Sequence, residues 1–277
     1  MDGARYSETW GDTTHQYIPN LVNEIARKGV VCHQFYNNGH TYTVSGHAAI
    51  TTAIYQEIDN GGMESPQYPS IFQYWLESND KDSTSAWIIS SKDKLEVLAD
   101  CNVEMWKGKN NPSTNCGIDG LGVGSGYRHD SLTYMKTIDI LSHFHPQLTL
   151  VNFREPDYSA HNGDWDNYVN GIIETDKYIY KIWQFVESDP IYSGKTTLFV
   201  TNDHGRHLDG VADGFSGHGD NCEGCRRINL FAIGPDFKKG YLSGVSRNLI
   251  DIPSTVAELL NFRIANNQGE VMKEIFE

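Results

Sequence analysis

The chain has 277 residues, of which 39% are hydrophobic and 12% aromatic, a composition typical of a folded globular protein rather than a disordered one. Its 22 Lys and Arg residues against 36 Asp and Glu residues give a formal net charge of −14, which repels nucleic-acid backbones and excludes a nucleic acid duplex as partner. No apolar stretch approaches the roughly 20 residues of a membrane-spanning helix, so no membrane span is expected.

Helices and strands are predicted to alternate from the first residues onward. Residues 13–28 carry apolar side chains at helical spacing, and Lys28-Gly29 provides a good C-terminal stop for this helix. A strand is predicted at residues 30–35, followed by a helix rich in small residues at 45–53 that opens just after Thr43. A further helix is predicted at residues 69–76 and a second strand at 86–89.

The second half of the chain begins with residues 101–130, which have scattered Gly, Asn and Pro and little periodicity, so we predict an irregular insertion there. Residues 167–187 are expected to form a long amphipathic helix. Three strands are predicted at residues 148–153, 197–200 and 229–233. A polar Gly-rich loop is predicted at residues 205–225, and a closing helix after Asp251-Ile252-Pro253-Ser254.

This alternation favours an α/β fold with a mostly parallel central sheet and helices on both of its faces. A chain of this size can bury a substantial core within one domain. We see no internal repeat, linker or low-complexity segment, so residues 1–277 are predicted to form a single domain.

The five cysteines are an odd number. Cys101 and Cys116 bracket a loop rich in Asn, Gly and Pro, so a disulfide between them is one alternative and free thiols are the other. Cys222 and Cys225 form a Cys-x-x-Cys motif, but a zinc knuckle would require a second such pair, so a local disulfide or two free thiols are favoured. Because a disulfide indicates an oxidising compartment, we expect a periplasmic or secreted protein, with a cytoplasmic one as the alternative.

The most informative stretch is Asp203-His204-Gly205. An apolar, β-branched run that stops at an Asp-His-Gly turn predicts a buried strand that delivers two metal-ligand side chains to its carboxyl edge. Gly205 permits the turn that brings both side chains to one ion. His218 lies between two glycines, so no bulky neighbour restricts its approach to a metal.

Asp157 and His161 lie four residues apart just after a predicted strand. In a helical turn both side chains point the same way and can share one ion, whereas the alternative is a surface carboxylate and a solvated histidine. Asp2 adds a carboxylate with no strand before it, so we expect the chain to begin inside the domain and any export signal to lie upstream. His207 and His40 are competing histidines, for which a solvated loop position is the favoured interpretation.

Thr43 precedes a predicted helix, where the positive end of the helix dipole and free N–H groups suit a phosphate. A helix cap is the alternative role, and Ser45 and Thr41 are rival nucleophiles. A bound metal lowers the pKa of a hydroxyl enough for attack without a histidine base. Lys92 and Lys94 follow a strand end and can reach the free oxygens of a terminal phosphate, although a solvated helix start is the competing interpretation.

Together these segments resemble the alkaline phosphatase superfamily, and in pattern they are most similar to its type I phosphodiesterase/nucleotide pyrophosphatase and phosphonoacetate hydrolase branch. The resemblance extends over nearly the whole chain. Its individual motifs are weak, but their ordered combination is highly specific. The motifs that carry the resemblance are Asp2-Gly3-Ala4-Arg5, Thr43-Val44-Ser45-Gly46-His47, Glu155-Pro156-Asp157 with His161, Asp203-His204-Gly205, Gly217-His218-Gly219 and Asp251-Ile252-Pro253-Ser254-Thr255-Val256.

The resemblance implies two metal ions, with zinc expected and manganese as the alternative. It implies one ligand set of Asp157, His161 and His218. It implies a second set of Asp2, Asp203 and His204, with Thr43 bridging toward that ion and forming a covalent phospho-enzyme that water hydrolyses.

The segment Lys92-Asp93-Lys94 resembles the phosphate clamp of the monoesterase and phosphonoacetate hydrolase members. We therefore expect a phosphohydrolase that cleaves small-molecule phosphate monoesters. A phosphodiesterase/nucleotide pyrophosphatase or a phosphonate hydrolase on the same scaffold is the alternative, and a non-catalytic metal-binding relative is the alternative of another class.

Three departures from related patterns narrow these alternatives. Ser45-Gly46 stands where diesterases typically carry Pro-Asn. Cys32 lacks the Cys-x-Pro-x-Arg context that sulfatases need to make formylglycine, so a sulfatase is not expected. The chain is also too short for the inserted domain of cofactor-independent phosphoglycerate mutase. We expect substrate specificity to lie in the 101–130 insertion and the 205–225 loop.

Overall fold

The computed structural model describes residues 1–277, and the chain forms two compact units, each assembled from separated stretches of sequence. The predicted α/β class is confirmed, because strands and helices make up both units. No helix combines the length and the apolar character that crossing a membrane requires. The single domain 1–277 stays a prediction. The first unit comprises residues 1–37, 155–247 and 272–277, and the second comprises residues 38–154 and 248–271.

The first unit contains a sheet in the strand order β5-β6-β1-β7. β1 and β7 are parallel, whereas β6 runs antiparallel to both β1 and β5, a pairing that the sequence pattern does not reveal. Phe231 of β6 lies opposite both Val31 and Val200, so β6 is the central strand between two apolar neighbours. The strands are β1 Val30–Tyr36, β5 Leu198–Thr201, β6 Arg227–Ile233 and β7 Tyr241–Ser243, and the short β8 follows at Arg247–Asn248.

The longest helix of the first unit, α5 Trp165–Ser188, begins where the Asp164 side chain accepts a hydrogen bond from the Asn167 amide at 3.0 Å. It confirms the predicted amphipathic helix. Asp176 on its buried face accepts the backbone N–H of Leu21 at 2.7 Å and so holds the start of η2. The other helical segments are η1 Tyr6–Glu8, η2 Leu21–Ala26, α4 Asp157–His161, η6 Gly214–Ser216, α6 Glu223–Arg226 and η7 Lys273–Ile275.

The helix predicted over residues 13–28 is wrong in its extent, because the continuous helical stretch begins only at Pro19, and from Leu21 to Ala26 it is a π-helix. Asp12 accepts the backbone N–H of Thr14 at 2.9 Å, a local bond that competes with helix formation. His15 has φ of 51°, a left-handed conformation that cannot lie inside a right-handed helix. Apolar spacing alone could not show this interruption.

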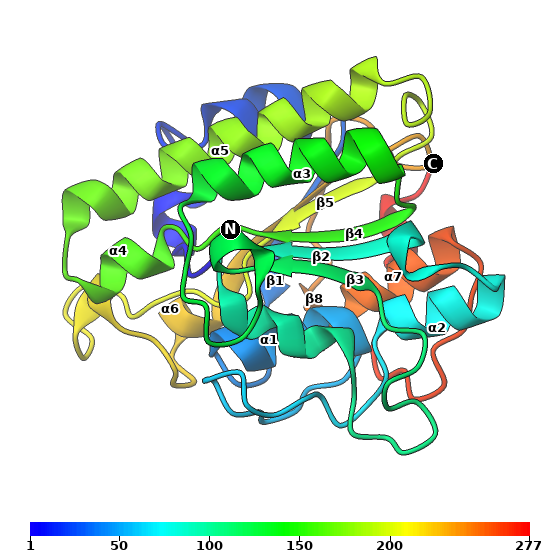
Figure 1. Ribbon diagram of the computed structural model, residues 1–277. Helices are drawn as coiled ribbons and strands as arrows, with labels where there is room; N and C mark the ends of the chain where they lie inside the picture. Colours follow the sequence, from blue (N-terminus) through cyan, green and yellow to red (C-terminus); the bar gives the residue numbers. More distant parts are fainter. The chain divides into compact units, whose positions relative to one another are not determined.

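The second unit is built on a parallel sheet in the order β3-β2-β4. Helix α3 lies on one side of this sheet, and α2 and α7 lie on the other (Figure 1). The core includes Phe72, Trp75 and Ile88, all buried. The elements are α1 Thr43–Thr52, α2 Ile71–Asn79, η3 Ser83–Ser85, β2 Ala86–Ser90, η4 Asp93–Ala99, β3 Ser113–Cys116, η5 Ile118–Gly120, α3 Asp130–Phe144, β4 Leu148–Asn152 and α7 Asp251–Leu259.

One strand and one α-helix of the second unit escape sequence analysis. The 101–130 segment is not wholly irregular, since it contains β3, which pairs with β2 through short polar residues. Helix α3 is missed because its side chains do not follow the usual apolar stripe. Thr133 and Thr137 are buried, whereas Leu132 and Met135 are exposed.

All five cysteines are free thiols, so the disulfide alternatives for Cys101 with Cys116 and for Cys222 with Cys225 are wrong. Cys116 is the last residue of β3, and its thiol donates to the Ile88 carbonyl of the neighbouring strand at 3.6 Å. The side chain is therefore directed into the sheet. No disulfide therefore supports the predicted periplasmic or secreted location.

We expect Cys101 and Cys116 to resist alkylation in the folded protein. Burial raises the pKa of Cys116 to about 12, and burial also raises the pKa of Cys101. At pH 8 a pKa near 12 lowers the reactive thiolate fraction of Cys116 on the order of a thousandfold relative to a free thiol. Iodoacetamide labelling followed by peptide mass spectrometry, with and without urea, measures this protection. Labelling of either thiol in the folded protein at the rate of the urea-treated sample would contradict it.

Candidate functional site

Asp203 and His204 follow directly after β5 in the first unit and are buried, as is Asp2. The Gly3 amide donates to Oδ1 of Asp203 at 3.2 Å and places the segment that carries Asp2 against it. Nε2 of His204 lies 3.3 Å from Oδ2 of Asp203 and 3.7 Å from Oδ1 of Asp2. We call Asp2, Asp203 and His204 the first ligand group.

The orientation of the His204 ring suits a cation. Its Nδ1 lies 2.9 Å from the carbonyl oxygen of Gly205, which can only accept, so Nδ1 carries the proton and Nε2 presents a lone pair. Nε2 makes no hydrogen bond, although the His204 side chain is 0% exposed and two carboxylates face it. A buried lone pair among carboxylates is unfavourable alone and is typical of a metal ligand. The first ligand group therefore fits a divalent cation.

Asp157 and His161 occupy the two ends of α4, four residues apart, so one helical turn directs both toward the same point. Oδ1 of Asp157 lies 3.3 Å from Nε2 of His161 and 3.4 Å from Nε2 of His218. The two imidazole nitrogens are 3.1 Å apart. We call Asp157, His161 and His218 the second ligand group. The solvated alternative is wrong for Asp157, which is buried, and His161 is half exposed.

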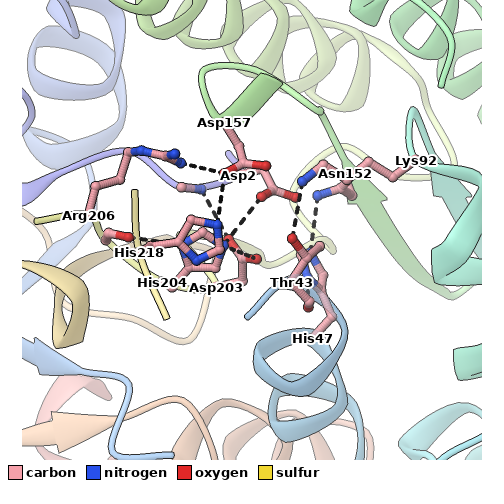
Figure 2. A network of polar contacts seen from close by, with 12 residues as sticks. Asp2, Thr43, His47, Lys92, Asn152, Asp157, Asp203, His204, Arg206 and His218 are labelled. Carbon is pink, nitrogen blue, oxygen red and sulfur yellow. Dashed lines mark hydrogen bonds and ion pairs between the residues drawn. The ribbon is translucent and has the colours of Figure 1, made fainter. Parts of the chain in front are cut away.

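The two ligand groups are neighbours within the first unit, as Figure 2 shows. The rings of His204 and His218 stack with their centroids 3.8 Å apart. One ligand atom each from Asp157, His204 and His218 lie within 4.8 Å of one another, and the same holds for Asp2, Asp203 and His204. His204 thus belongs to both sets, and the arrangement suits two adjacent cations.

Sequence analysis misses Arg206, which is fully buried beside the second ligand group. Its guanidinium forms an ion pair with Asp157 (Figure 2). It also lies 3.4 Å from Nδ1 of His161 and donates to the Ser216 carbonyl at 2.7 Å. Gly3 makes this packing possible, because a Cβ there would lie 2.9 Å from both the guanidinium and the Asp157 carboxylate. The position of Arg206 two residues after His204 was a signal, but a metal-centred interpretation gave it no role.

Thr43, the predicted nucleophile, is the first residue of α1 in the second unit and is 1% exposed. Nζ of Lys92, a side chain also 1% exposed, donates to Oγ1 of Thr43 at 3.1 Å. The rival hydroxyl of Ser45 is engaged with the backbone, since it accepts the Ile58 amide at 3.2 Å. Thr43 is not the N-cap residue, because Tyr42 occupies that position and Thr43 is the first residue of the helix.

Lys94 lies near the same helix start. Its Nζ donates to Oδ1 of Asn60 at 3.2 Å, and the same oxygen accepts the Val44 amide at 3.0 Å. The first-turn amide of Val44 is therefore capped by Asn60, contrary to the expectation of free N–H groups there. The solvated interpretation of Lys92 and Lys94 is also wrong, because both side chains are buried.

His47 and Asn152 support Thr43 and were given no role by sequence analysis. Nδ1 of His47 donates to the Thr43 carbonyl at 2.8 Å, and Nδ2 of Asn152 donates to Nε2 of the same ring at 3.1 Å (Figure 2). Ser90 donates to the amide oxygen of Asn152 at 3.0 Å and accepts the Lys92 amide at 2.9 Å. The ends of β2 and β4 thereby orient the first turn of α1.

The two competing histidines have different surroundings. His40 is partly exposed and lies 3.9 Å from a carboxylate oxygen of the exposed Glu57, as the solvated interpretation requires. His207 is buried, which contradicts the solvated interpretation, and it belongs to neither ligand group.

Comparisons with known proteins place the chain among alkaline phosphatase-like enzymes. A family model described as Metalloenzyme superfamily matches residues 110–264. The 2,3-bisphosphoglycerate-independent phosphoglycerate mutase of Gracilaria tenuistipitata var. liui is 28% identical over 127 residues, which are 44% of this chain. The chain matches only 22% of the length of this curated relative.

Solved structures share the fold at low sequence identity. The phosphonate monoester hydrolase of Agrobacterium radiobacter has a TM-score of 0.71 and 13% identity, with 100% of this chain and 75% of that chain covered. The corresponding hydrolase SpPMH of Silicibacter pomeroyi has a TM-score of 0.69 and 13% identity, with coverage of 98% and 74%. Murine ectonucleotide pyrophosphatase/phosphodiesterase 5 has a TM-score of 0.68 and 14% identity, with coverage of 100% and 98%.

Proposed function

The chain belongs to the Metalloenzyme superfamily of alkaline phosphatase-like proteins, and on this premise we propose that it is a two-metal phosphohydrolase that cleaves small phosphate monoesters. The observation that carries the proposal is the buried Nε2 of His204, which faces the carboxylates of Asp2 and Asp203 without a hydrogen bond of its own. Such a group is costly in a protein unless a cation completes it.

We propose that the first ligand group would hold one divalent ion and the second ligand group the other. Bound at these residues, the ions would lower the pKa of the attacking hydroxyl and offset negative charge on the leaving oxygen. Imidazole and carboxylate ligands suit zinc, and manganese is the alternative metal. Arg206 keeps Asp157 and His161 oriented through its ion pair and its bonds to loop carbonyls.

Thr43 is proposed as the nucleophile. Its Oγ1 would attack phosphorus, the ester oxygen would leave with a proton from solvent, and water would then hydrolyse the phospho-threonine. The ammonium of Lys92, 3.1 Å from Oγ1, favours the ionised form of that oxygen. His47 and Asn152 hold the backbone of Thr43 in place. Ser45 is less suited as a nucleophile, because its hydroxyl oxygen already accepts a hydrogen bond from the Ile58 amide.

A panel of phosphate monoesters, diesters, phosphonates and sulfates, assayed with protein reconstituted with zinc or manganese, tests this function. We expect the highest kcat/KM on monoesters. A preference for diesters or phosphonates would instead assign the alternative activities of this scaffold. Stoichiometric metal without turnover of any ester would overturn the enzymatic proposal in favour of a binding protein.

Neutralising the two buried lysines should separate monoester from diester activity. Lys92→Met and Lys94→Met remove positive charge with little change in side-chain length, and a monoester carries one more negative oxygen than a diester. We expect each variant to lower kcat/KM about 10- to 100-fold for p-nitrophenyl phosphate and less than about 10-fold for bis(p-nitrophenyl) phosphate. Lys107→Met, at an exposed lysine of the same unit, is the matched control. Equal losses on the two esters would count against a phosphate clamp.

A further inference from the structure

A third group of potential metal-binding side chains lies in the first unit and shares no residue with the two ligand groups. It consists of His207, Asp220, Cys222 and Cys225, whose ligand atoms all lie within 4.8 Å of one another. We call it the cysteine cluster. None of its members belongs to the centre proposed for hydrolysis, so the proposed function does not explain why these residues lie together.

His207 is held in the orientation of a ligand. Its side chain is 9% exposed, and its Nδ1 lies 2.5 Å from Oδ1 of Asp213, which fixes the proton on Nδ1. Nε2 therefore presents its lone pair to the cluster and makes no hydrogen bond, although Oδ2 of Asp220 is only 3.2 Å away. A carboxylate that holds the far side of an imidazole is the usual support of a histidine bound to zinc.

The two cysteines form a tight turn beside His207. The Cys225 amide donates to Sγ of Cys222 at 3.4 Å, and the Cys222 amide donates to Oδ1 of Asp220 at 2.9 Å. The turn is packed against the neighbouring backbone, because a Cβ on Gly224 would lie 2.3 Å from the Arg206 carbonyl oxygen. Both thiols are free, and Cys225 is buried. The sulfur atoms are thus positioned by backbone contacts that do not depend on a disulfide.

We propose that His207, Asp220, Cys222 and Cys225 bind a third divalent cation, a structural zinc ion. Two sulfur ligands select zinc over magnesium, calcium and manganese, and the imidazole and carboxylate complete four-coordination by protein alone. The sequence argument against a zinc knuckle required a second Cys-x-x-Cys pair. The folded loop supplies a histidine and an aspartate in its place.

The proposed zinc would also stabilise the loop that carries the proposed ligand His218. The cluster closes the chain between His207 and Cys225, and this segment contains His218. The His207 amide donates to the Gly217 carbonyl at 3.0 Å, so the residue next to His218 is tied to the cluster. The Gly205 amide donates to the Cys225 carbonyl at 2.7 Å and ties the cluster to the residue after His204. Loss of this zinc should therefore loosen the second ligand group.

Metal analysis of the whole protein, produced with zinc and kept reduced, tests the site without reference to turnover. We expect three zinc ions per chain in the wild-type protein and two in the Cys222→Ser/Cys225→Ser variant. Cobalt substitution should give a sulfur-to-cobalt charge-transfer absorption in the near ultraviolet, and the double variant should lack it. Cys32→Ser, at a buried cysteine of the same unit, is the matched control and should keep both signals.

His207→Asn is the second variant, and it retains both thiols. We expect this variant to lower the zinc content by one ion and to weaken the cobalt absorption. If the thiols bound the metal without His207, neither quantity would change. Thr43→Ala should keep all three ions, so that failure of the proposed nucleophile is distinguished from failure of this site. A wild-type protein without the sulfur-to-cobalt absorption, or a zinc content that neither variant lowers, would overturn the proposal. So would a Cys222–Cys225 disulfide in the protein kept reduced.

Discussion

Thr43→Ala is expected to lower kcat for phosphate monoesters at least about a thousandfold while the protein retains its metal. The substitution removes Oγ1, the only atom assigned to form a bond with phosphorus. The residues proposed to bind the metal ions lie at other positions, so binding of the ions should be unaffected. Steady-state kinetics on p-nitrophenyl phosphate together with metal analysis of the same preparation measures both effects.

Two further variants sharpen this result. Thr43→Ser keeps a hydroxyl beside Lys92 and should retain turnover within about tenfold of the wild-type protein. Ser45→Ala removes a hydroxyl that bonds to the Ile58 backbone, so we expect a loss of stability with little loss of turnover. Acid quenching during turnover, followed by mass spectrometry, should find phosphate on Thr43. Wild-type hydrolysis by Thr43→Ala would show that the nucleophile is assigned wrongly.

His204→Ala is expected to remove most hydrolytic activity together with metal from the proposed catalytic centre. Its imidazole faces both carboxylates of the first ligand group and also lies within 4.8 Å of the ligand atoms of Asp157 and His218. Removing it deprives the proposed first ion of a ligand and removes the imidazole that lies beside both Asp2 and Asp203. We expect metal affinity at this centre to fall by more than about a hundredfold and kcat/KM by about a thousandfold or more.

Competition with a chelator of known affinity, monitored by zinc release, measures the first effect. His40→Ala, at a partly exposed histidine, is the control and should change neither metal affinity nor turnover. The zinc proposed at the cysteine cluster should remain in His204→Ala, since none of its four ligands is altered. Unchanged affinity at every zinc site in His204→Ala would contradict the assignment of His204 as a ligand.

Sequence alone was sufficient for most α-helices and strands and for the residue types of the proposed metal centre. Strands β2 and β5 are continuous apolar runs that end at Ser90 and Thr201, and β4 is an apolar run interrupted by Thr149 and ended by Asn152. A carboxylate next to an imidazole after a strand is a local signal, so Asp203 and His204 were identifiable without a structure. The four-residue spacing of Asp157 and His161 was equally local, because one helical turn determines their relative direction.

Tertiary structure alone decided what depends on distant segments. The antiparallel placement of β6, the polar buried face of α3 and the burial of Lys92 depend on contacts that leave no periodic trace in the sequence. Arg206 acquires a role only because the loop carbonyls and Asp157 surround it.

The cysteine cluster shows the same division. Cys-x-x-Cys is visible in the sequence, but its completion by His207 and Asp220 required the loop to fold back upon itself. Chain order constrains neighbours along the backbone, whereas coordination depends on distances in space, and only packing determines those distances.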